Sequence, residues 1–113
     1  MARLELRNAR NTLIEEKNRL DQEMTTLTDK YNLAVETLGQ HRRLQFEYRE
    51  GKESLPNTNS SKGAKKVFND KIVEHQIKID EIQKTLEEYE KSRVVLASKI
   101  KAMDKSIKEL QTA

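Results

Sequence analysis

A seven-residue repeat of apolar side chains runs through the second half of the chain, and it constrains the fold more than any other feature. Between Phe68 and Leu110, thirteen positions alternate in spacing between four and three residues, and eleven of them are apolar or aromatic. This alternation lines the side chains along one seam of a helix and predicts a coiled coil, whereas a strand would require alternation at every second residue. The two polar exceptions are His75 and Arg93.

A second seven-residue repeat occupies the first half of the chain. A parallel homodimer of this helix would place Arg10 against Arg10 and Lys17 against Lys17, and the repulsion between these charges argues against such a dimer. The two repeats are therefore expected to pair with each other. The seam positions of the first half are Arg3, Leu6, Arg10, Leu13, Lys17, Leu20, Met24, Leu27, Tyr31, Ala34 and Leu38.

The stretch between the repeats is the only one without helical character. It reads GKESLPNTNSSKGAKK and contains the only proline, Pro56, with two of the three glycines. Gly51 is suited to end the first helix, because glycine tolerates the left-handed conformation that often follows a helix C-terminus. Ser60 or Ser61 could cap the second helix. We expect an exposed, mobile loop here that reverses the chain.

These features together predict an all-α fold, namely a long two-helix antiparallel coiled-coil hairpin that could associate further into a helical bundle. The hairpin is expected to be a single domain over residues 1–113. We expect the first helix at about 2–50, the loop at about 51–62 and the second helix at about 63–111.

The two repeats also suggest how the helices pair. If each seam residue of one helix shares a layer with a seam residue of the other, the paired residue numbers add up to 113, and the midpoint falls at Pro56 and Asn57. In this register Tyr31 lies level with Ile82 and Leu38 with His75. The expected seam core consists of Leu6, Leu13, Leu20, Met24, Leu27, Tyr31, Leu38, Ile79, Ile82, Leu86, Tyr89, Leu96, Ile100, Met103 and Ile107.

The composition agrees with long, solvent-exposed helices. Charged residues make up 36% of the chain and aromatic residues only 4%, which is too polar for a large globular core. The absence of cysteine excludes disulfides and thiolate zinc sites, and no apolar run is long enough to span a membrane. We expect a soluble, intracellular protein in the cytoplasm or nucleus.

No group of residues in the sequence predicts catalysis. The adjacent acids Glu15 and Glu16 lie on a solvated helix face, where neighbouring residues do not converge on a substrate. We expect no enzymatic activity, no cofactor and no metal. His41 and His75 are expected in neighbouring layers near the loop. They are interpreted mainly as polar seam residues, with a pH-sensitive pair and a metal site as alternatives.

Basic residues gather at two places. The basic tip beside the loop could contact an acidic protein or nucleic acid, and the interspersed acids and the lack of a nucleic-acid motif weaken the case for nucleic acid. The basic seam end could cover the core with aliphatic stems or receive further helices. The basic tip consists of Arg42, Arg43, Arg49, Lys52, Lys62, Lys65 and Lys66, and the basic seam end of Arg3, Arg10, Lys17 and Arg93.

The predicted hairpin resembles two known groups in shape. Beta-type prefoldin subunits are similar in length and form helical hairpins that hold unfolded chains, but KESLPNTNSSKG lacks their strand-forming sequence. The FliJ and YscO stalk proteins of flagellar and type III export are similar as antiparallel hairpins, and LQFEYRE followed by a polar loop fits them. These resemblances imply a holdase or an export chaperone. An arm of a larger coiled-coil protein explains the sequence equally well.

The function we expect from these observations is a noncatalytic protein-protein interaction or scaffold module. It would bind a protein partner, or a second copy as a homo-oligomer, through its helix faces. The alternatives are binding of nucleic acid or an acidic partner through the basic tip, and a chaperone role.

Overall fold

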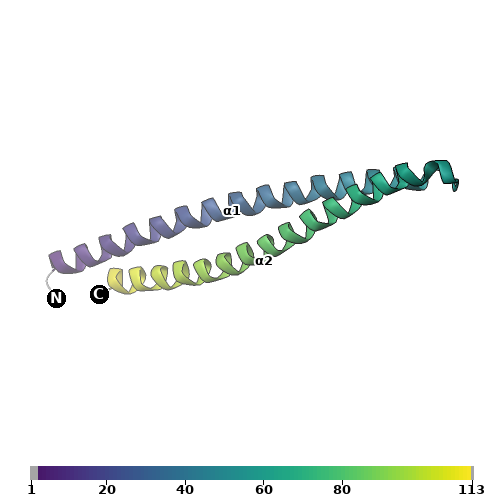
Figure 1. The fold of residues 1–113 in the computed structure, drawn as a ribbon. Coiled ribbons are helices and arrows are strands. Elements are labelled where there is room, and N and C mark those ends of the chain that lie inside the picture. Colours follow the sequence, from purple (N-terminus) through teal and green to yellow (C-terminus); the bar gives the residue numbers. More distant parts are fainter. Residues whose placement is uncertain (1–2, 113) are drawn as a thin grey trace. The chain divides into compact units, whose positions relative to one another are not determined.

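A computed structural model describes residues 3–112, and it confirms the predicted all-α hairpin. Helix α1 spans Arg3–Glu53, a short 3-10 helix η1 spans Asn59–Ser61, and helix α2 spans Lys62–Thr112 (Figure 1). Within residues 3–112 the chain forms no strand. Glu, Lys, Leu, Gln and Arg predominate in both long helices, and these residues lose little side-chain freedom in a helix.

The helices divide into two compact units. Unit 1 contains residues 3–31 and 88–112, and unit 2 contains residues 32–87 with the loop. Each unit consists of one segment of α1 and one of α2 that run in opposite directions (Figure 1).

The first helix ends later than the sequence predicts. Gly51 lies inside α1, which continues to Glu53, and no described residue has a positive φ. The expectation that Gly51 ends the helix in a left-handed conformation is therefore wrong. Glycine leaves room here for the Phe68 ring, since a Cβ on Gly51 would lie 3.0 Å from Cε1 of Phe68.

The loop, which the sequence predicts to be exposed and mobile, contains several backbone hydrogen bonds. The Ser54 amide donates to the Glu50 carbonyl and the Leu55 amide to the Lys52 carbonyl, which closes the C-terminal turn of α1. Beyond Pro56 the chain enters η1, and α2 follows it directly at Lys62.

Ser61 links several residues of this loop through hydrogen bonds of its side chain. It is buried, and its hydroxyl lies 2.9 Å from the Thr58 carbonyl oxygen and is also hydrogen-bonded to the Pro56 carbonyl. Ser61 directly precedes α2, where the sequence predicted a cap. Its side chain instead binds carbonyl groups of the loop, while Ser60 is exposed and pairs with the Thr58 hydroxyl.

The predicted seam residues lie between the helices in both units. Buried residues are Leu20, Leu96 and Ile107 in unit 1 and Leu38 and Ile79 in unit 2. Half-buried residues are Leu6, Leu13, Met24, Leu27, Tyr31, Tyr89, Ile100 and Met103 in unit 1 and Ile82 and Leu86 in unit 2. None of the described side chains is less than 2% exposed, so two helices alone give a thin core.

The pairing register differs from the prediction in unit 2. The His75 ring contacts both the His41 ring, at 5.1 Å between centroids, and the Tyr48 ring, at 5.6 Å. His75 therefore lies level with the point of α1 midway between His41 and Tyr48. This point is close to Gln45 and seven residues beyond Leu38, the expected partner. The offset between Leu38 and Gln45 is one heptad of seven residues.

Unit 1 shows the same offset independently. Tyr31 was expected level with Ile82, but its ring lies 4.9 Å from the guanidinium carbon of Arg93. Lys17 was expected beside Leu96, but its Nζ lies 2.9 Å from Oδ1 of Asp104. The predicted register is wrong by one heptad, because a shift of seven residues returns every seam position to the same face of its helix.

Candidate interaction surfaces

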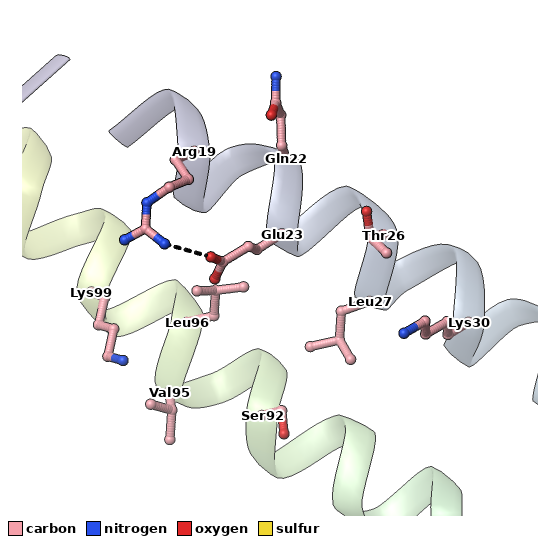
Figure 2. Close-up of a pocket in the computed structure, with 10 residues that line it drawn as sticks. All are labelled: Arg19, Gln22, Glu23, Thr26, Leu27, Lys30, Ser92, Val95, Leu96 and Lys99. Carbon is pink, nitrogen blue, oxygen red and sulfur yellow. Dashed lines mark hydrogen bonds and ion pairs between the residues drawn. The ribbon is translucent and has the colours of Figure 1, made fainter. Parts of the chain in front are cut away.

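Unit 1 contains an open groove between α1 and α2, which we call the unit 1 groove. Its volume is about 670 Å³. Its lining residues are Arg19, Gln22, Glu23, Thr26, Leu27 and Lys30 of α1 and Ser92, Val95, Leu96 and Lys99 of α2 (Figure 2).

The unit 1 groove has an apolar strip with charged residues around it. Leu27 extends from α1 toward α2, and Leu96 and Val95 lie on the facing turns of α2 (Figure 2). Val95 is 55% exposed, although it lies beside this strip. A valine and two leucines in an open groove form a surface that can receive apolar side chains of another helix.

Arg19 is held at the rim of the unit 1 groove by two carboxylates. Its Nη1 donates to Oε1 of Glu23 at 2.9 Å (Figure 2), and its Nη2 pairs with Glu16. The hydrogen bond with Arg19 lowers the pKa of Glu16, and the hydrogen bond with Glu16 raises the pKa of Arg19. Both carboxylates belong to α1, so the guanidinium lies on the α1 side of the groove in this arrangement.

The basic seam end is partly neutralised by ion pairs of Lys17 and Arg93. Lys17 pairs with Asp104, and this hydrogen bond raises the pKa of the Lys17 ammonium. Arg93 donates to Glu90 at 3.1 Å and lies over the Tyr31 ring. Both side chains are about one-third exposed. Arg3 is exposed and Arg10 is half-buried. Lys17 therefore pairs across the two helices, whereas Arg93 pairs within α2 and lies over an aromatic ring of α1.

Several large apolar side chains lie outside the seam in both units. They are 44–66% exposed. Unit 1 carries Leu4, Val94 and Val95, and unit 2 carries Leu33, Val35, Phe46, Val67, Val73 and Ile77.

The basic tip lies in unit 2, where a second groove, which we call the tip groove, has a volume of about 520 Å³. Only three residues of the basic tip line this groove, namely Arg49, Lys52 and Lys65. The other lining residues are Glu53, Leu55, Asn57, Asn69 and Ile72.

The remaining four residues of the basic tip lie outside the tip groove. Arg42, Arg43, Lys62 and Lys66 are all exposed. Arg43 lies 4.0 Å from Glu47, at the limit of an ion pair. The sequence therefore identified the charge of this region, but it could not divide the seven residues between the groove and the open surface.

The aromatic side chains near the basic tip pack mainly between the helices. The ring centroids of Tyr48 and Phe68 lie 6.2 Å apart, and the Tyr48 ring stacks on the His75 ring with an angle of 19° between them. Phe46 is the exception, since it is 59% exposed and does not line the tip groove.

The two histidines form a pair in unit 2. Their Nδ1 atoms lie 2.9 Å apart, so one imidazole donates a hydrogen bond and the other accepts it. Among residues 3–112, no group of three His, Asp or Glu side chains is arranged to hold a metal ion.

Gln45 is a polar seam residue whose role the sequence did not indicate. It is buried, and its Nε2 donates to the Ile72 carbonyl at 3.1 Å and to Oε1 of Gln76 at 2.9 Å. Gln76 in turn donates to Asp80 at 2.9 Å. In the sequence, the seam positions that follow Leu38 are His41, Gln45 and Tyr48, but only the register shows which groups form hydrogen bonds with Gln45.

No helix within residues 3–112 combines the length and apolar character needed to cross a membrane. No protein-family model, curated protein or solved structure matches this chain. The exposed surfaces of the two units are therefore the features from which a function can be inferred.

Proposed function

We propose that the protein is a noncatalytic interaction module that binds a partner, or a second copy of itself, by packing further helices against its faces. The observation that carries this proposal is the set of large apolar side chains exposed outside the seam. The outer faces of a two-helix coiled coil that stays alone are normally charged or polar.

The thin core of each unit supports this proposal. Because no side chain within residues 3–112 is less than 2% exposed, the two helices obtain little stabilisation from their shared seam. Burial of one valine or leucine side chain contributes about 1.5–3 kcal/mol, so an added helix over several of them would stabilise the fold substantially.

The unit 1 groove is one place where such a helix could pack. Leu27, Val95 and Leu96 offer the apolar contact, while Lys30 and Lys99 can pair with acidic residues at the edges of an incoming helix. The charged rim would favour one orientation of the bound helix.

Two neighbouring valines provide a matched test. Val95 lines the unit 1 groove, whereas Val94 is similarly exposed, at 59%, and does not line it. Analytical ultracentrifugation between about 10 μM and 1 mM protein would measure self-association. Val95→Glu should weaken it by about tenfold or more, and Val94→Glu by less than about threefold.

A photo-crosslinking residue in place of Val95 or Val94 would detect a partner of a different sequence. Crosslinks that form from position 95 and not from position 94 would support the proposal. A chain that stays monomeric throughout the concentration range and forms no crosslink preferring position 95 would contradict it.

A further inference from the structure

We propose that the tip groove is a separate binding site for an acidic peptide segment that also carries an aliphatic side chain. The site lies entirely in unit 2 and does not depend on helix packing in the unit 1 groove. Three cations, two amides and two aliphatic side chains line it, with one carboxylate.

The cations come from both helices and enclose the tip groove. Arg49 and Lys52 lie one turn apart near the end of α1, and Lys65 lies in the first turn of α2. Lys65 Nζ donates to Oδ1 of Asn57, which places the ammonium beside the loop. Glu53 is the only acid in the lining, so the site has an excess of two positive charges.

The groups in the tip groove suit carboxylates. A guanidinium can bind both oxygens of a carboxylate, and Arg49 is exposed and forms no ion pair with another residue of the described chain. The Asn57 amide oxygen is occupied by Lys65, which leaves the amide nitrogen to donate to an incoming acceptor.

The apolar part of the lining favours a peptide over nucleic acid. Leu55 and Ile72 are half-buried and can contact an aliphatic side chain between two acidic ones. No aromatic side chain lines the groove, and Tyr48 and Phe68 pack against each other between the helices. Base stacking, which supplies much of the affinity for single-stranded nucleic acid, would therefore be absent.

Fluorescence anisotropy with a labelled peptide of alternating Asp, Glu and Leu residues would test the proposal. We expect binding at about 50 mM salt that weakens as salt increases, because exposed ion pairs are screened. A peptide with serine in place of leucine should bind at least about threefold more weakly, since it loses the contacts with Leu55 and Ile72.

Charge reversals inside and outside the tip groove provide the control. Arg49→Glu with Lys52→Glu should weaken peptide binding by about tenfold or more, whereas Lys62→Glu with Lys66→Glu removes the same charge outside the groove and should weaken it by less than about threefold. Circular dichroism would confirm that both variants keep the helical fold.

Three outcomes would overturn the proposal. Equal losses in the two double variants would show a diffuse attraction to the whole basic tip. Tighter binding of a single-stranded oligonucleotide than of the peptide would assign the site to nucleic acid. No binding of the leucine peptide at about 50 mM salt would show that the groove is no peptide site. None of these results would change the outcome of the Val95 test in unit 1.

Discussion

The Nδ1 atoms of His41 and His75 face each other across unit 2 at a distance of 2.9 Å. Because one atom must donate and the other accept, the two neutral rings must be different tautomers. The donor ring carries its proton on Nδ1 and the acceptor ring on Nε2.

Nitrogen-15 NMR of the imidazole rings near pH 8 would test this arrangement. We expect one ring protonated on Nδ1 and one on Nε2. The His75→Asn variant serves as the control, because His41 then loses its ring partner and its nitrogen shifts should change. Protonation of both rings on Nε2 in the unaltered protein would contradict the pair.

The contact between Tyr31 and Arg93 provides a test of the register in unit 1. A cation over an aromatic ring at 4.9 Å contributes about 0.5–1 kcal/mol at a partly exposed site. A double-mutant cycle with Tyr31→Leu and Arg93→Met, measured by urea unfolding, should give a coupling of this size. Coupling between Tyr31 and Ile82 with none to Arg93 would instead support the register expected from sequence.

The pair of Lys17 and Asp104 predicts a pH dependence of stability. Hydrogen bonding to Asp104 raises the pKa of Lys17 in the folded protein, so the folded state binds this proton more tightly than the unfolded state. The stabilising effect is present below the pKa of an unfolded lysine, about 10.4, and is lost as pH rises through the folded pKa.

Thermal melting between about pH 8 and pH 11.5 would measure this effect. The melting temperature should be higher in the unaltered protein than in Lys17→Met at the lower pH, and the difference should shrink as pH rises. High salt should also reduce it, because the pair is exposed. A difference that grows with pH would contradict the assigned pair.

Two helical glycines allow the close contact at Gly51 to be tested. Alanine in a helix is favoured over glycine by about 1 kcal/mol. A Cβ at Gly39 would have no neighbouring atom within 4 Å, so Gly39→Ala should raise the free energy of unfolding by about this amount. Gly51→Ala must move the Phe68 ring, which lies 3.0 Å from the new Cβ, and should therefore gain less or lose stability. Equal increases in the free energy of unfolding, measured with urea, would show that the contact between the new Cβ and Phe68 costs no stability.

Two adjacent serines test the order of the loop. Ser61→Ala removes a buried hydroxyl that binds the carbonyl groups of Pro56 and Thr58, and it should lower the free energy of unfolding by about 1 kcal/mol. Ser60→Ala removes an exposed hydroxyl and should have a smaller effect. Similar effects in chemical denaturation would indicate that the loop does not depend on Ser61.

The sequence identified the basic residues of the candidate site but not the groove that contains some of them. Arg49, Lys52 and Lys65 line the tip groove because α1 continues past Gly51 and the loop folds back toward α2. The contributions of Asn57 and Leu55 depend on the conformation of an irregular loop. No periodic pattern encodes such a conformation, so they could not be predicted.

What the sequence determined by itself is the helical fold and the face that each helix buries. Apolar residues repeated every seven positions specify a seam whatever the partner, and the residues between Leu6 and Ile107 that form this seam lie between the helices. A shift of one heptad leaves that pattern unchanged, so the repeat could not select the register. The tertiary structure fixes the register through specific contacts between the helices. Gln45 lies level with His75, the Arg93 guanidinium lies over the Tyr31 ring, and Lys17 pairs with Asp104.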